Sequence, residues 1–156
     1  MTHGISNGGL CIRAARKCDL TALTAALEPC IVGAQVTRRL EESLLGYREM
    51  LVAELNGQAV GTVSVGGRGF QIPGSLRLFA LDVGEAYRNR GVATALVKAV
   101  ETMAADRGLD KVNLEVAIDN EKAIRLYKRL GFRRHGNPVM DGEAPSWVMV
   151  KKLERP

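Results

Sequence analysis

The heptapeptide Arg88-Asn89-Arg90-Gly91-Val92-Ala93-Thr94 lies between an apolar run and the clearest helical pattern of the chain. The apolar run, Leu76 to Val83, is short enough to be a buried strand. From Val92 onward, apolar residues recur at i, i+3, i+4, i+7, i+8 and i+11, which predicts an amphipathic helix that Gly108 closes. The stretch is therefore predicted to turn a buried strand into a helix N-terminus.

A turn of this kind favours an anion. The first N–H groups of a helix have no intrahelical acceptor, and the helix dipole adds partial positive charge at the same end. Gly91 and Ala93 leave the backbone open to a phosphate, while Arg88 and Arg90 add positive charge. An ordinary helix start with solvated arginines accounts for these residues equally well.

The residues after this helix continue the alternation of strand and helix. Lys111 to Ala117 is typical of a strand, and Asp119 or Asn120 can cap a following helix that Gly131 stops. The apolar face of that helix carries Ala123, Tyr127 and Leu130. The succession of strand, helix and strand from Leu76 to Ala117 predicts a right-handed crossover and locally parallel strands.

The residues before the apolar run predict an antiparallel hairpin. Its arms, Arg48 to Leu55 and Gln58 to Val65, flank Asn56-Gly57, which supplies the two positive φ angles of a type I′ turn. Further upstream we expect a strand at Leu10 to Arg13 and two helices. The first helix is capped by Asp19 and ends near Glu28, before Pro29, and the second runs from Thr37 to Gly46.

These elements predict an α/β (α+β) fold with a mixed central sheet of about six to seven strands and about four helices, in a single domain over residues 1–156. The last strands are expected at Phe132 to His135 and Trp147 to Leu153, joined by a loop from Pro138 to Pro145.

Composition narrows the class of protein. The net charge of +5 suits a polyanionic ligand, but the chain lacks a long basic run and has few aromatic residues, so nucleic-acid binding is not expected. The three cysteines have no zinc-like spacing, which predicts reduced thiols and no metal site. With no apolar segment long enough to span a membrane and no signal-like N-terminus, we expect a cytoplasmic, soluble protein.

Two blocks of the sequence resemble one known family. Arg88-x-x-Gly91-x-Ala93 is similar to the Arg/Gln-x-x-Gly-x-Gly/Ala signature of the GNAT superfamily of acyl-CoA-dependent N-acyltransferases. A second block is similar to the strand–helix segment in which that family repeats N-x-x-A-x-x-L-Y and a terminal G-F. It comprises Leu114-Glu115-Val116, Asn120, Ala123, Leu126-Tyr127 and Gly131-Phe132. Together the blocks extend from Leu76 to Arg133.

The resemblance implies that the cofactor is acetyl-CoA (coenzyme A), bound where the parallel strands in the middle of the sheet splay apart. The pantetheine arm is then expected to pair with backbone near Leu81 and Val83, and the pyrophosphate to rest on the turn. The expected cofactor-binding residues are Leu81, Val83, Arg88, Asn89, Arg90, Gly91, Val92, Ala93, Thr94, Asn120, Ala123 and Tyr127. Asn120 can equally serve only as a helix cap.

The resemblance also implies catalytic roles for two residues. Tyr127 is the candidate proton donor to the leaving thiolate, because a phenol is protonated at neutral pH. Glu115 is the candidate base for the amine, with Asp82 and Glu85 as rivals, and the N–H of Val83 is the expected oxyanion donor. The other interpretation of Tyr127 is that it only packs on the sheet. The other interpretation of Glu115 is a solvated glutamate or an ion pair at the edge of the core.

The expected function is transfer of an acetyl group to a primary amine in a direct ternary complex. The acceptor can be a small-molecule amine or a peptide amine, and a homodimer is possible in this family. The alternative is a non-catalytic acyl-CoA-binding sensor or scaffold module, which would need the turn but neither Glu115 nor Tyr127.

Overall fold

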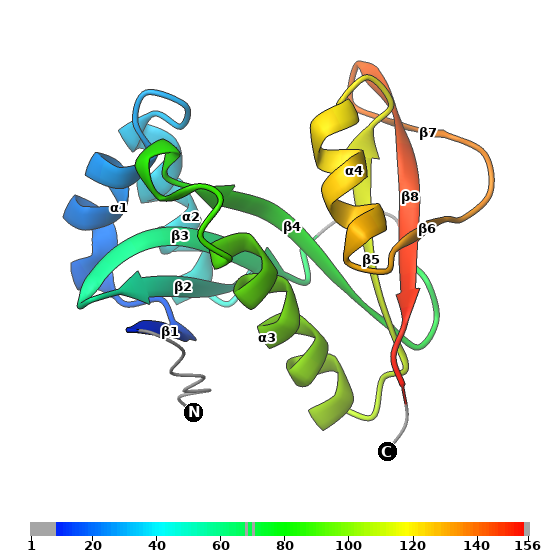
Figure 1. The fold of residues 1–156 in the computed structure, drawn as a ribbon, viewed down its shortest axis with the longest axis horizontal. Helices are drawn as coiled ribbons and strands as arrows, with labels where there is room; N and C mark the ends of the chain where they lie inside the picture. Colours follow the sequence, from blue (N-terminus) through cyan, green and yellow to red (C-terminus); the bar gives the residue numbers. More distant parts are fainter. Residues whose placement is uncertain (1–8, 68, 70, 155–156) are drawn as a thin grey trace. The chain divides into compact units, whose positions relative to one another are not determined.

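The computed structural model describes residues 9–67, 69 and 71–154, which divide into two compact units (Figure 1). The first unit takes its residues from Met1–Gly66 and Ala80–Ala99, and the second from Gly67–Phe79 and Val100–Pro156. Strand β4 (Ser75–Val83) and helix α3 (Val92–Asp106) each contribute residues to both units. Each unit is described in turn.

The first unit is built on the predicted hairpin. Strands β2 (Glu49–Leu55) and β3 (Gln58–Val65) pair antiparallel, with Leu55 opposite Gln58. Asn56 and Gly57 have φ angles of 51° and 82°, so the type I′ turn predicted from the dipeptide is confirmed. Strand β1 (Leu10–Ala14) adds antiparallel to β2 at the edge.

One face of this hairpin is covered by α1 (Leu20–Leu27) and α2 (Gly33–Leu44), which contact β3 and β2 respectively (Figure 1). A short 3₁₀ turn, η1 (Lys17–Asp19), leads into α1, which ends before Pro29 as expected. Helix α2 begins at Gly33 rather than at Thr37, so the predicted start was wrong. The core between helices and strands consists of Leu23, Leu27, Val36, Leu40, Met50, Val52 and Ala59.

The opposite face of the hairpin approaches the N-terminus of α3 at Gly61. A Cβ at Gly61 would lie 3.1 Å from the carbonyl oxygen of Asp82 and 3.3 Å from side-chain carbons of both Val83 and Val92. These distances are tighter than ordinary van der Waals contacts, so the absence of a side chain at Gly61 allows the close approach. Gly61 thereby helps to position the first turn of α3.

The second unit is an antiparallel arrangement around β8 (Ala144–Lys152). Strand β5 (Lys111–Ala117) pairs with one edge of β8, and β6 (Arg133–Arg134) and β7 (Val139–Asp141) also pair with it. Helix α4 (Glu121–Arg129) follows β5 along the chain and belongs to the same unit (Figure 1). The predicted loop from Pro138 to Pro145 was wrong, because its residues form β7, a turn and the start of β8.

Strands β4 and β5 form the predicted parallel pair. Their register joins Ser75 to Lys111, Leu76 to Val112 and Arg77 to Asn113. The side chains fix this end of the pair as well, since the hydroxyl of Ser75 donates to the Oδ1 of buried Asn113 at 2.6 Å. The pairing given by this register is therefore three residues long, within a nine-residue strand.

Hydrogen-bonded neighbours among the described residues follow the order β1-β2-β3-β4-β5-β8-β6, with β7 beside β8. The mixed α/β fold with its parallel pair is thus confirmed, and the described part of the chain contains four α-helices and, with β7, eight strands. The prediction of one domain over residues 1–156 stays a prediction. Within the described part of the chain, no helix combines the length and apolar character needed to cross a membrane.

Candidate functional site

The turn before α3 has the backbone geometry of an anion site. After the 3₁₀ turn η2 (Glu85–Tyr87), Asn89 and Gly91 adopt φ angles of 63° and 78°. The first helical hydrogen bond of this segment runs from the N–H of Ala95 to the carbonyl of Gly91, at 3.0 Å. The N–H groups of the three residues before Ala95 therefore belong to the open end of the helix, where backbone concavities bind phosphate.

Gly91 is required for its conformation rather than for space. A Cβ at this position would meet nothing within 4 Å, whereas a φ of 78° is unfavourable for any residue with a side chain. The turn residues from Arg88 to Gly91 are exposed, and Val92 is buried and anchors the helix. An anionic group can therefore reach the turn from solvent.

The two arginines of the turn contact residues of the same unit. Nη2 of Arg88 donates to the thiol sulfur of Cys30 at 3.6 Å. The guanidinium of Arg90 lies over the ring of Tyr87, 5.9 Å from its centroid. Each guanidinium is thus in contact with a neighbouring side chain of the first unit.

The C-terminal half of β4 contains an unusual backbone conformation. Ala80 has a φ of 51°, the left-handed region, in the middle of a strand. A residue other than glycine rarely adopts this conformation, which costs about 1 kcal/mol or more. Local irregularities of strands are frequent beside active sites. Leu81 and Val83, the residues expected to pair with the pantetheine arm, follow directly and are half-buried.

The two rival candidates for the base occupy different surroundings. The carboxylate of Asp82 accepts a hydrogen bond from Nη1 of Arg39 on α2 at 2.7 Å, so it is held by an ion pair. Glu85 is exposed and lines a pocket of about 460 Å³ together with Ala25, Ala26, Glu28, Gln58, Ala86 and Tyr87.

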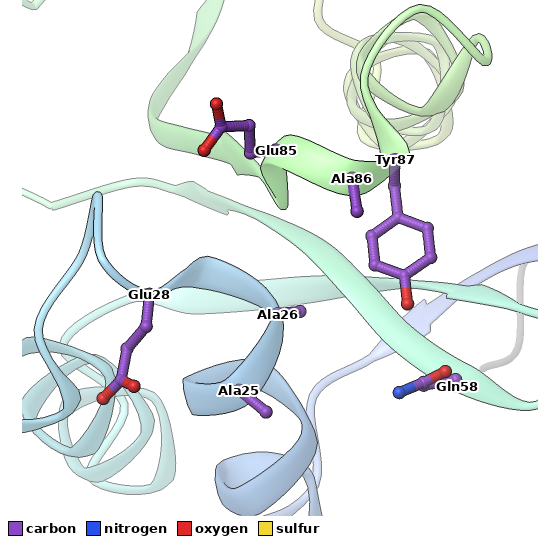
Figure 2. Close-up of a pocket in the computed structure, with 7 residues that line it drawn as sticks. All are labelled: Ala25, Ala26, Glu28, Gln58, Glu85, Ala86 and Tyr87. Carbon is purple, nitrogen blue, oxygen red and sulfur yellow. The ribbon is translucent and has the colours of Figure 1, made fainter.

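In this pocket the Tyr87 hydroxyl points toward the strand of Gln58, whereas the carboxylates of Glu28 and Glu85 point in different directions (Figure 2). The two carboxylates therefore do not converge on one point within the pocket. The pocket lies next to the turn, because its lining residue Tyr87 immediately precedes Arg88 along the chain.

Glu115, the candidate base, lies on β5 and forms a buried ion pair. Nε of Arg77, on the neighbouring strand β4, donates to both carboxylate oxygens at 2.9 and 3.1 Å. The side chains keep only 10% and 5% of their exposure, in the order Arg77 and Glu115. The ion pair that was one interpretation of Glu115 therefore exists, and it orients the carboxylate.

Tyr127, the candidate proton donor, is half-buried on α4. Its ring makes an edge-to-face contact with buried Phe132, with centroids 5.9 Å apart and planes at 67°. The N–H of Phe132 also donates to the carbonyl of Tyr127 at 2.9 Å. The ring contact and the backbone hydrogen bond both join Tyr127 to the G-F segment that ends the second sequence block.

Asn120 caps α4, as one of its two interpretations predicted. Its Oδ1 accepts a hydrogen bond from the N–H of Ala123 at 3.2 Å. The cap links two of the residues expected to bind the cofactor, and a cofactor-binding role for either stays a prediction.

Sequence reasoning missed Arg77 and Arg39, which hold two of the candidate carboxylates. Neither arginine has a local signal, because each partner is distant along the chain: 38 residues for Arg77 and 43 for Arg39. Glu115 and Tyr127 belong to the second unit, and the turn with Leu81 and Val83 belongs to the first. Among the described residues, no group of histidine, cysteine and acidic side chains has an arrangement that could hold a metal ion.

Comparisons with known proteins show the family of the chain. Residues 17–132 match the model of the acetyltransferase (GNAT) family, which covers more than half of the chain. The chain therefore belongs to the acetyltransferase (GNAT) family, whose members are acyltransferases that generally use acetyl-CoA.

Individual relatives share this assignment. The chain is 40% identical over 89 residues to the mouse probable N-acetyltransferase family 8 member 5, covering 54% of this chain and 38% of that protein. It is 39% identical over 94 residues to rat N-acetyltransferase 8, covering 58% and 41%. The chain thus spans about two fifths of the length of these curated relatives.

A solved structure is similar over nearly its whole length. The ribosomal-protein-alanine N-acetyltransferase of Brucella melitensis is 25% identical, with a TM-score of 0.69, and the match covers 91% of this chain and 99% of that one.

Proposed function

We propose that the chain is an N-acetyltransferase that moves an acetyl group from acetyl-CoA to a primary amine in a direct ternary complex. The observation that carries this proposal is the turn before α3, where positive φ angles at Asn89 and Gly91 precede an open helix end flanked by two arginines. Members of the family generally use acetyl-CoA, and the diphosphate of this acyl donor fits such a turn.

The cofactor's diphosphate would be held by backbone N–H groups from Asn89 to Thr94 and by the charges of Arg88 and Arg90. The backbone of Leu81 and Val83 would hold the pantetheine arm. Bound acetyl-CoA supplies an activated thioester to the acceptor amine. The unusual conformation of Ala80 supports this assignment, because it changes the direction of the backbone groups just before Leu81.

Two side chains would move protons. The phenol of Tyr127, whose ring packs edge-to-face against Phe132, would donate a proton to the departing sulfur. The carboxylate of Glu115, oriented by Arg77, would accept the proton of the acceptor's ammonium directly or through a water molecule. The N–H of Val83 would donate to the oxygen that becomes negative during transfer.

For the acceptor we propose a peptide amine or a small-molecule amine. The Brucella relative acts, by its name, on the alanine of a ribosomal protein, which favours a peptide N-terminus. No tyrosine lies in the segment from Asp141 to Pro145, where the family resemblance leads us to expect tyrosines in a peptide-modifying enzyme, so small amines stay in the test panel.

The proposal is tested by calorimetry with coenzyme A and by thiol release from acetyl-CoA with a panel of peptides and amines. We expect coenzyme A binding that Gly91→Ala weakens, and transfer to at least one amine that Tyr127→Phe slows by about 10²-fold. Coenzyme A binding without transfer to any amine would instead indicate a sensor or scaffold module. Absence of coenzyme A binding by the folded protein would refute the proposal altogether.

A further inference from the structure

Arg77 is a charged residue in the middle of an apolar strand. It lies in the sequence Ser75-Leu76-Arg77-Leu78-Phe79, between the buried residues Leu76 and Leu78, and is itself 9% exposed. A buried ion pair contributes little net stability, because desolvation offsets most of the attraction, and apolar residues of similar volume often replace it without loss. The presence of an arginine here therefore calls for a reason other than stability.

The surroundings of Arg77 restrict its guanidinium on several sides. Nε donates to both oxygens of Glu115, and the group lies over the ring of Phe79, 4.7 Å from the centroid. Gly67 and Gly69 lie on another side, because a Cβ at Gly69 would collide with the guanidinium and one at Gly67 would lie 2.8 Å from the Phe79 ring. All these residues belong to the second unit.

Gly69 serves this arrangement by its lack of a side chain. Gly67 has a φ of 68°, which by itself favours glycine. At Gly69, a Cβ would overlap the guanidinium of Arg77. Arg77 therefore occupies the space that a side chain at this position would need.

We propose that Arg77 is a positioning residue for Glu115 and that Gly69 makes room for it. The inference rests on the proposed function, in which Glu115 accepts a proton from the acceptor. A proton acceptor has to be held in a narrow range of orientations, and its supporting residues have to be held as well. Nε of Arg77 holds both oxygens of the carboxylate, and Arg77 lies over Phe79 in the space that glycine at position 69 leaves open.

Two single variants test the proposal from opposite sides. Arg77→Lys keeps the charge but loses the planar guanidinium, and Gly69→Ala keeps the arginine but displaces it. We expect each to lower kcat by about 10²-fold while KM for acetyl-CoA stays within about twofold, because a misplaced catalytic group affects the chemical step. Arg125→Lys, on the exposed side of α4, is the matched control and is expected to keep the wild-type kcat.

A double-variant cycle then shows whether Arg77 acts through Glu115. Arg77→Lys is expected to have no further effect on kcat in a Glu115→Gln background, because residues that act as a unit are not additive. Independent, multiplied losses in the double variant would overturn the proposal. So would wild-type kcat in a folded Arg77→Lys or Gly69→Ala protein, with folding checked by circular dichroism.

Replacement of both charges separates this role from stability. The variant Arg77→Met with Glu115→Leu is expected to keep a melting temperature near that of the wild type and to lose transfer activity. A large fall of its melting temperature would assign the pair to the fold and overturn the proposal. Wild-type protein without transfer activity would refute the proposed function instead, so the two failures are distinguishable.

Discussion

Two arginine–carboxylate pairs in this chain are buried to a similar degree and are built differently. The side chains of Arg13 and Asp19 keep 7% and 5% of their exposure, and those of Arg77 and Glu115 keep 10% and 5%. In the first pair, two different nitrogens of Arg13 donate to the two oxygens of Asp19, at 2.9 and 2.7 Å. In the second pair, one nitrogen, Nε of Arg77, donates to both oxygens of Glu115.

The two pairs also differ in the number of residues that separate the arginine from its carboxylate along the chain. Arg13 and Asp19 are six residues apart, and Asp19 additionally accepts a hydrogen bond from the N–H of Arg16 at 2.7 Å. That pair ties the end of β1 to the turn before α1. Arg77 and Glu115 are 38 residues apart and join neighbouring parallel strands. Equal burial therefore does not imply an equal role, and substitutions distinguish the two.

The largest effect on stability is expected at the first pair. Asp19→Ala leaves the guanidinium of Arg13 buried without its main partner, which should lower the free energy of unfolding by about 3–5 kcal/mol. Urea denaturation measures this loss, and coenzyme A affinity under native conditions should stay unchanged. A loss below about 1 kcal/mol would mean that Glu54, the second partner of Arg13, compensates.

At the second pair the larger effect is expected on activity. Glu115→Gln keeps a hydrogen-bond acceptor for Arg77 but removes the base, so kcat should fall by about 10²-fold. The free energy of unfolding should fall by only about 1–3 kcal/mol, since the amide oxygen still pairs. Steady-state kinetics and urea denaturation of the same preparation separate the two effects. Full activity of this variant would transfer the role of base to Asp82 or to water.

Acid sensitivity gives a smaller effect that belongs to the first pair. Burial opposes ionisation of Asp19, but hydrogen bonds from Arg13 and the Arg16 N–H, together with the charge of Arg13, outweigh it and hold the pKa of Asp19 below its ordinary value of 3.8. A lowered pKa in the folded state contributes stability at pH values above the ordinary pKa, and this is lost as pH falls through the folded value. The melting temperature of the wild type should therefore fall below about pH 4, and that of Asp19→Asn should fall less steeply.

The smallest effect on stability is expected at an exposed ion pair. Nε of Arg38 lies 3.8 Å from Oε1 of Glu42 on α2, and the Arg38 side chain is 69% exposed. Arg38→Ala should change the free energy of unfolding by about 0.3–0.5 kcal/mol, because solvent and salt screen such pairs. A larger change in thermal melts would mean that α2 depends on its surface charges more than its buried residues suggest.

The parts of the fold that local chemistry determines could be predicted from the sequence. The Asn56-Gly57 turn, the end of α1 before Pro29 and the strand–turn–helix around Gly91 each depend on residues next to one another. The start of α2 could not be predicted in the same way, because Val32 precedes the helix without any side-chain cap. The β7–β8 hairpin did have a local signal, the glycine of its two-residue loop Gly142-Glu143, which the neighbouring prolines obscured.

The candidate site was predictable only in part, for the same physical reason. The residues of the turn from Arg88 to Thr94 are contiguous, so the conformation of the turn could be predicted from its own sequence. Glu115 and Tyr127 were found through the resemblance to a family, whereas Arg77 and Gly69 were not found. Their relation exists only after β4, β5 and the β3–β4 connection have come together, and no spacing along the chain encodes it.

The left-handed conformation of Ala80 has a consequence for sequence variation at this position. A strand residue ordinarily accepts valine, isoleucine and threonine most readily, and glycine and asparagine least. At a φ of 51° this order is reversed, because a branched Cβ meets the neighbouring carbonyl whereas glycine and asparagine tolerate the conformation. In a complete substitution library selected for folding, β4 should therefore show one position with the tolerance profile of a turn inside a segment with that of a strand.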